Sequence, residues 1–123
     1  QASDLYELGS VQLRKRLYPQ ATASLKQALK RANGEPEEAR AVIENALGFS
    51  LAAQKDYEGA VRHYKLALKA KPDYPIAINN LAFAKDKLLK TEEAADLYRK
   101  TLELDPGNTT AQKRLKQLER RLG

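Results

Sequence analysis

The sequence predicts an all-α solenoid of three stacked helical hairpins and a closing helix, seven helices in a single domain that spans residues 1–123. Apolar residues recur at spacings of three and four along the chain, which is the period of amphipathic helices. The pattern then returns after 34 residues, a length typical of a two-helix repeat. No stretch alternates between apolar and polar residues as a half-buried strand does.

The repeat is clearest between residues 41–74 and 75–108, where eight positions are identical and about two would agree by chance. These positions hold small residues, large apolar residues and a terminal proline. They are Asn45/Asn79, Leu47/Leu81, Phe49/Phe83, Glu58/Glu92, Ala60/Ala94, Tyr64/Tyr98, Leu68/Leu102 and Pro72/Pro106.

An earlier copy of the repeat occupies about residues 2–35 and matches at an offset of 39 instead of 34. The five extra residues lie between the first and second repeats, in the segment from Asn33 to Arg40. Asn33-Gly34 predicts a helix end, and Pro36 fits the first turn of the next helix. The second repeat, about residues 36–74, is therefore expected to open with an extended helix.

The third repeat is expected to cover residues 75–108, and a capping helix residues 109–123. Asp56 and Thr91 are expected to be N-caps, because their side-chain oxygens can accept from free backbone amides. The capping helix needs one apolar stripe and one solvated face. Its predicted stripe consists of Leu115, Leu118 and Leu122.

The segment NALGFSLAAQKDYEGAVRHYKLALKAKPDY resembles the tetratricopeptide repeat. That repeat has a large and then a small residue in its first helix. In its second helix it has a small residue, an aromatic residue and another small residue, and a proline follows. Leu47-Gly48, Ala60, Tyr64, Ala67 and Pro72 match these positions. The resemblance covers residues 2–108 and implies a right-handed superhelical solenoid whose first helices line a concave, non-catalytic binding surface for a polypeptide.

Small residues explain how the paired helices approach each other. Two helices come close only where the side chains between them are small, and each repeat places such residues in both helices. The expected contacts are Gly9 with Ala21, Gly48 with Ala60, and Ala82 with Ala94.

A narrower resemblance concerns the opening ELGSVQLRKRLYPQA, the run from Glu44 to Lys87, and the closing LELDPGNTTAQKRLKQLERRLG. These segments are similar to membrane-anchored tetratricopeptide proteins of cyanobacteria and plastids that assist photosystem I assembly. The resemblance implies photosystem I subunits or assembly intermediates as partners. It also implies a place at the thylakoid membrane, on the cytoplasmic or stromal side, with an anchor upstream of Gln1. The alternative is a general adaptor that binds another peptide segment in a bacterial envelope or secretion pathway, with a cytoplasmic location.

The family resemblance maps the partner groove onto eight residues of the first helices. They are Tyr6, Ser10, Asn45, Phe49, Ala52, Asn79, Phe83 and Asp86. An asparagine amide can both donate to and accept from a bound main chain, and a phenylalanine one turn away offers apolar contact area. The alternative for Phe49 and Phe83 is that they pack in the core between neighbouring repeats.

Some relatives hold a C-terminal carboxylate in a clamp of lysine, asparagine and arginine. The corresponding positions here are Tyr6, Ser10, Ala46, Ile76 and Asn80. Charge-paired capture of a carboxylate requires cations at such a site. The clamp is therefore not expected in this chain.

Composition excludes several other functions. The chain has no cysteine and one histidine, His63, which is expected at the surface, so no metal site, cofactor or catalytic residue is predicted. The net charge is +6, and a basic surface is expected on the last helix, at Lys113, Arg114, Lys116, Arg120 and Arg121. This surface is either a solvated face or a contact for anionic lipid. Nucleic-acid binding is not expected, because no aromatic residues interleave with these cations.

Overall fold

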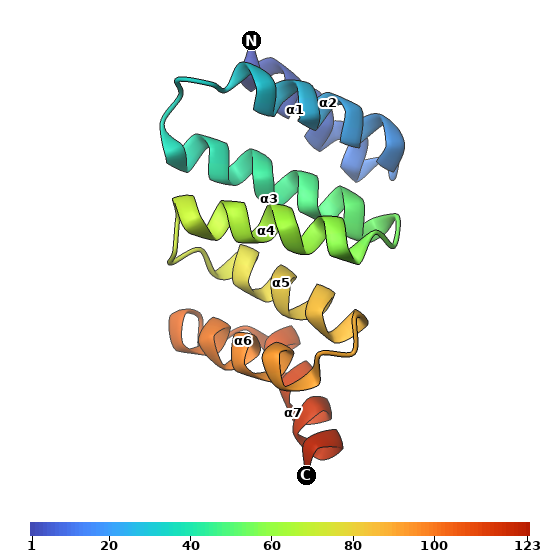
Figure 1. Ribbon diagram of the computed structural model, residues 1–123, viewed down its shortest axis with the longest axis vertical. Helices are drawn as coiled ribbons and strands as arrows, with labels where there is room; N and C mark the ends of the chain where they lie inside the picture. Colours follow the sequence, from blue (N-terminus) through green and yellow to red (C-terminus); the bar gives the residue numbers. More distant parts are fainter.

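Seven α-helices and no strand make up the computed structural model, which describes all of residues 1–123 (Figure 1). The helices are α1 (Ala2–Arg14), α2 (Tyr18–Arg31), α3 (Glu37–Ala53), α4 (Tyr57–Ala70), α5 (Pro75–Lys87), α6 (Thr91–Leu104) and α7 (Thr109–Leu122). The predicted all-α class and helix number are confirmed. No helix is both long enough and apolar enough to cross a bilayer.

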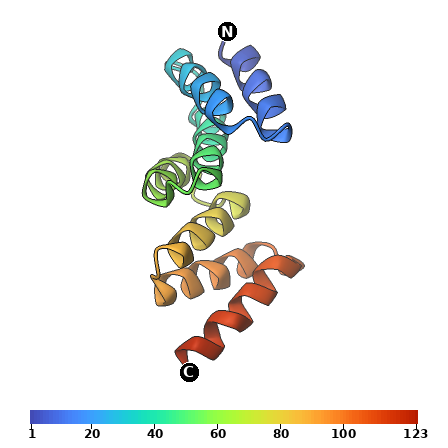
Figure 2. The ribbon, with the colours of Figure 1, turned by 90° about the vertical axis from the view of Figure 1, so that its right-hand side faces the viewer.

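The helices stack in sequence order, and the two chain ends lie at opposite ends of the stack (Figures 1 and 2). Here α1, α3 and α5 are the A helices, and α2, α4 and α6 are the B helices that follow them. Each helix packs chiefly against the helices before and after it. The apolar interior is accordingly divided into five small clusters instead of one core. This is the organisation of a solenoid, in which each repeat is stabilised by its neighbours.

The A helices carry small residues where they meet the side chains of the B helices. A Cβ atom added to Gly48 would lie 2.6 Å from Cε1 of Tyr64, and one added to Gly9 would lie 2.7 Å from Cγ of Leu25. Ala21 and Ala60, the expected contacts of these glycines, are buried. The atoms nearest to the added Cβ, however, belong to Leu25 and Tyr64, four residues after those alanines. The small residues therefore make room for large buried side chains.

Of the two predicted N-caps, Asp56 is confirmed and Thr91 is not, and Asn108 caps the last helix. Asp56 Oδ1 accepts from the backbone N–H of Gly59, and Asn108 Oδ1 accepts from that of Ala111, each at 3.0 Å. Thr91, expected to be an N-cap, is instead the first residue of α6, and Lys90 precedes it without a side-chain cap.

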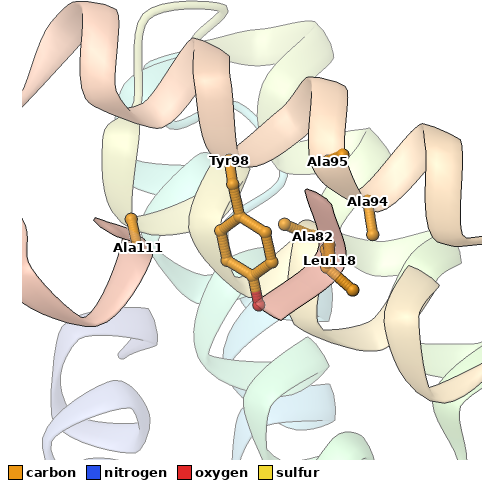
Figure 3. Packing of buried hydrophobic residues seen from close by; sticks show 6 residues of the cluster. All are labelled: Ala82, Ala94, Ala95, Tyr98, Ala111 and Leu118. Carbon is orange, nitrogen blue, oxygen red and sulfur yellow. The ribbon is translucent and has the colours of Figure 1, made fainter. Parts of the chain in front are cut away.

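Helix α7 covers the third hairpin. Its Ala111 and Leu118 join the buried cluster around Tyr98, together with three alanines of α5 and α6 (Figure 3). Leu115 packs against this cluster, whereas Leu122, the third member of the predicted stripe, is largely exposed. Burial raises the pKa of Tyr98 to about 12, opposed by nearby Arg114 and reinforced by Asp86. The Tyr98 hydroxyl is therefore protonated at neutral pH.

Candidate functional site

A cleft of about 420 Å³ opens between α3, α5 and α7, beside the start of α4. Four of the eight predicted groove residues line it together, namely Phe49, Ala52, Asn79 and Phe83. The other lining residues are Ala53, Lys55, Tyr57, Tyr64, Asn80, Thr110 and Arg114. Tyr57 and Arg114 were not among the predicted groove residues. Both residues reach it from helices outside the A set.

The two phenylalanines occupy different surroundings in this cleft. Phe49 is 46% exposed. Phe83 is partly buried and meets the edge of the Tyr57 ring at a centroid distance of 6.4 Å. Cations flank the Phe83 ring, with Arg114 Cζ at 4.8 Å and Lys87 Nζ at 5.4 Å from its centroid. The cleft thus combines an open aromatic surface with a positively charged rim.

Asn79 contributes the one unpaired polar group in the wall of the cleft. Its Oδ1 atom is buried and has no hydrogen-bond partner in the chain. A buried amide oxygen without a donor costs about 1–3 kcal/mol, so such atoms are rare in folded proteins. Because this oxygen has no surface open to the cleft, a ligand N–H reaches it only when the Asn79 side chain turns toward the cleft.

Asn45 and Tyr6, two further predicted groove residues, do not line the cleft. Asn45 is buried, and its Oδ1 accepts from Nδ2 of Asn80 at 3.1 Å. Burial and then the nearby Tyr6 phenol raise the pKa of Tyr74, while a hydrogen bond with Asn45 acts in the opposite direction. Tyr6 also packs against the cluster at the N-terminal end of the stack, and neither it nor Ser10 lines the cleft. The Asn45 amide oxygen is therefore already paired within the chain.

The basic surface predicted on α7 divides between two directions. Arg121 Nη2 donates to Oδ1 of Asp86 at 3.1 Å. Asp86, which was predicted to line the groove, therefore already has a charged partner. Arg114 stacks on Phe83 and has no carboxylate partner within the chain. Lys113, Lys116 and Arg120 are exposed. Part of the basic surface therefore faces the cleft side, and the rest faces solvent.

His63 differs from the expectation of a surface residue. Its side chain is mostly buried, and its Nδ1 lies 3.3 Å from Oε1 of Glu44, which is also buried. Glu44 occupies the place where a tetratricopeptide first helix has a tryptophan, and this contact explains how a polar residue fits there. No three His, Cys, Asp or Glu side chains gather closely enough to hold a metal ion.

Comparison with family models identifies the repeat. One tetratricopeptide repeat model matches residues 6–75, and another matches residues 51–118. The chain belongs to the tetratricopeptide repeat family. It is a protein-interaction scaffold of the kind that such solenoids form with their extended surfaces.

Two proteins with similar sequences cover nearly the whole chain. The chloroplastic tetratricopeptide repeat domain-containing protein PYG7 of Arabidopsis thaliana is 33% identical over 121 residues, which are 98% of this chain and 40% of that protein. The uncharacterized protein ycf37 of Cyanophora paradoxa is 38% identical over 117 residues, 94% of this chain and 67% of that protein. The predicted resemblance to plastid tetratricopeptide proteins is confirmed.

Solved tetratricopeptide repeat structures have the same fold. The first such domain of Spaghetti (RPAP3), bound to an HSP90 peptide, matches with a TM-score of 0.90 and 24% identity, over 98% of this chain and 92% of that one. The tetratricopeptide repeat domain of Arabidopsis OM64 matches with a TM-score of 0.90 and 22% identity, over 98% of this chain and 95% of that one. The predicted solenoid of three hairpins with a capping helix is confirmed.

Proposed function

We propose that this tetratricopeptide repeat protein captures a peptide segment of a photosystem I subunit or assembly intermediate in the cleft between α3, α5 and α7. The observation that carries the proposal is the half-exposed ring of Phe49 in a cleft whose wall also holds Arg114 and the unpartnered Asn79. The sequence similarity to chloroplastic PYG7 and to ycf37 supports the choice of pathway. The proposed site is the thylakoid membrane, on its cytoplasmic or stromal side.

The chemistry of the cleft defines the segment that fits. A main-chain or side-chain N–H of the segment donates to Asn79, and an apolar side chain packs on Phe49. An acidic side chain next to the apolar one pairs with Arg114, whose guanidinium offers planar donors. The net positive charge of the chain accelerates the encounter with such a segment. This mode is distinct from the carboxylate clamp, whose positions hold Tyr6, Ser10, Ala46, Ile76 and Asn80.

Affinity capture from solubilised thylakoid membranes tests the proposal. The bait is the chain itself, and the test variant is Phe49→Ala, because Phe49 is exposed enough to be truncated without unfolding the repeat. We expect wild type to recover photosystem I subunits and the variant to recover at least about tenfold less, since an aromatic anchor in a binding site contributes 2 kcal/mol or more.

A matched control is Leu66→Ala, which truncates an equally exposed apolar residue on α4 outside the cleft. It should leave recovery unchanged. Equal recovery by wild type and Phe49→Ala would remove the cleft from the mechanism. Capture of an envelope or secretion protein in place of photosystem I subunits would favour the general adaptor.

A second variant, Asn79→Leu, examines the unpaired oxygen. It removes the buried acceptor and replaces it by an apolar group of similar size. We expect the chain to keep or gain stability, because the unsatisfied group is gone, while partner recovery falls. If binding persists at wild-type strength, the Asn79 oxygen is not a contact.

A further inference from the structure

The three turns between A and B helices, together with the last turn of α7, form one edge of the solenoid, here called the turn edge and defined as residues 14–17, 54–56, 87–90 and 119–122. The first three segments lie on the right-hand side of Figure 1, which faces the viewer in Figure 2. Arg121 bonded to Asp86 places the end of α7 beside the end of α5. Gln54 Nε2 donates to Oγ1 of Thr22 at 2.9 Å, which ties the second segment to the start of α2.

Leucines project from this edge into solvent. Leu17 is 42% exposed, Leu122 is 43% exposed, and Leu89 is 82% exposed at the tip of its turn. Leu89 also adopts a left-handed conformation with φ 63°, which is rare for a residue other than glycine or asparagine. Arg16 and Lys55 adopt the same conformation in the other two turns, so the turn shape belongs to the repeat, and the exposed apolar side chain is what sets Leu89 apart.

Cations surround these leucines. Arg14, Lys15 and Arg16 precede Leu17, while Lys87 and Lys90 flank the Leu88-Leu89 pair. The opposite edge of the solenoid has the other sign. Its connections at residues 33–38, 71–75 and 105–109 carry Glu35, Glu37, Glu38, Asp73 and Asp105 against Lys71 alone. The turn edge itself carries eight cations against Asp56 and Glu119, so the chain is electrically polarised across its width.

We propose that the turn edge docks on an anionic lipid bilayer, with Leu17, Leu89 and Leu122 inserted at headgroup depth. Lys and Arg side chains beside such leucines contact anionic headgroups, and each contributes to membrane attraction at short range. Nucleic acid fits this edge poorly, because none of its four segments contains an aromatic residue on which bases could stack. The proposal is independent of the peptide cleft, although Lys55 belongs to both surfaces.

Vesicle co-sedimentation tests the apolar part. Phosphatidylcholine vesicles with and without phosphatidylglycerol are the probes, and Leu89→Asn is the variant. Asparagine tolerates the left-handed conformation, so the turn keeps its shape. We expect wild type to partition onto the anionic vesicles only, and Leu89→Asn to partition about tenfold less, in line with the loss of one buried leucine side chain. Leu66→Asn, a change at an exposed leucine away from the edge, should not alter partition.

A charge comparison separates the turn edge from the solvent face of α7. Lys15→Gln/Lys90→Gln and Lys113→Gln/Lys116→Gln each remove two positive charges, and all four lysines are exposed. We expect about a tenfold or larger loss for the first pair and a small change for the second. Equal losses would show that only net charge matters, and a larger loss for the second pair would place lipid contact on α7. Either result, or equal binding to uncharged vesicles, overturns the proposal. Helicity by circular dichroism checks that every variant is folded.

Discussion

The second and third repeats share eight identical residues at an offset of 34, yet the structure surrounds those residues differently. Phe49 stands open at the cleft, whereas its counterpart Phe83 is enclosed by Tyr57, Lys87 and Arg114. Tyr57 of α4 and Lys87 of α5 contribute to the difference, and so does the helix that comes next in the stack. Phe83 faces α7, which differs in sequence from the A helices and carries an arginine at the contact.

The two repeats also differ in the ionisable residues that they bury. The second repeat buries Glu44 against His63, where the third has Ile78 and Leu97. The third buries Lys85, whose Nζ lies 3.1 Å from Oε1 of Glu93, where the second has Leu51 and Gly59. Conserved small and aromatic positions thus maintain the stack, while the variable positions set the local chemistry of each repeat.

The strongest test of this comparison concerns the small residue of the A helix. Gly48→Val places atoms where the ring of Tyr64 already lies 2.6 Å from an added Cβ, and Tyr64 is fully buried and cannot move aside. We expect the free energy of unfolding to fall by about 3 kcal/mol. Thermal unfolding followed by circular dichroism measures it. The equivalent position of the third repeat already holds Ala82, so Ala82→Gly should cost only about 1 kcal/mol. Equal effects would mean that the two interfaces are equally tight.

Removing one member of the buried Glu44–His63 pair should have the next largest effect. His63→Leu imports the residue of the third repeat but leaves Glu44 buried without its partner. We expect a loss of about 2 kcal/mol by chemical unfolding, below the range for fully buried pairs because His63 retains some exposure. The double variant Glu44→Ile/His63→Leu imports both residues and should recover wild-type stability or exceed it. A double variant with a lower free energy of unfolding than the single variant would show that the pair stabilises the fold.

Truncating the two phenylalanines should separate stability from binding. Phe83→Ala removes contacts with Tyr57 and Arg114 and should cost about 1–2 kcal/mol of stability, less than a fully buried phenylalanine. Phe49→Ala should cost about 1 kcal/mol or less, because the ring is already half in water. Both should weaken capture of the partner. Identical melting temperatures for the two variants would contradict the asymmetry described here.

The smallest effect is expected at the ion pair of the third repeat. A hydrogen bond and the charge of Lys85 lower the pKa of Glu93 from its ordinary value of 4.5. A carboxyl group with a lowered folded-state pKa stabilises the fold above the ordinary value, and this contribution disappears as pH falls through the folded-state pKa. Glu93→Gln should therefore lower the melting temperature slightly at neutral pH and not at all in acid. A difference that persists in acid would exclude the ion pair as its cause.

The sequence predicted the fold well because helical period, repeat length and terminal prolines all act locally or between adjacent helices. Phe49, Ala52, Asn79 and Phe83 were grouped because the family resemblance maps the groove onto them, and the repeat offset relates Phe49 to Phe83. Arg114 could not be placed in the cleft, because its position depends on how α7 packs. His63 was misplaced because a single histidine gives no period, and its contact with Glu44 joins two helices 19 residues apart.

The division of the interior into five clusters has a consequence for amide hydrogen exchange. The terminal helices each bury two residues, Ala2 and Gly9 in α1 and Ala111 and Leu118 in α7, whereas α3 buries seven. Protection should therefore rise from both ends toward the middle of the chain, because terminal helices can open without disturbing the rest. A ligand that bridges α3 and α7 would flatten this gradient on the C-terminal side alone, so that the kinetics of deuterium uptake would reveal where it is bound.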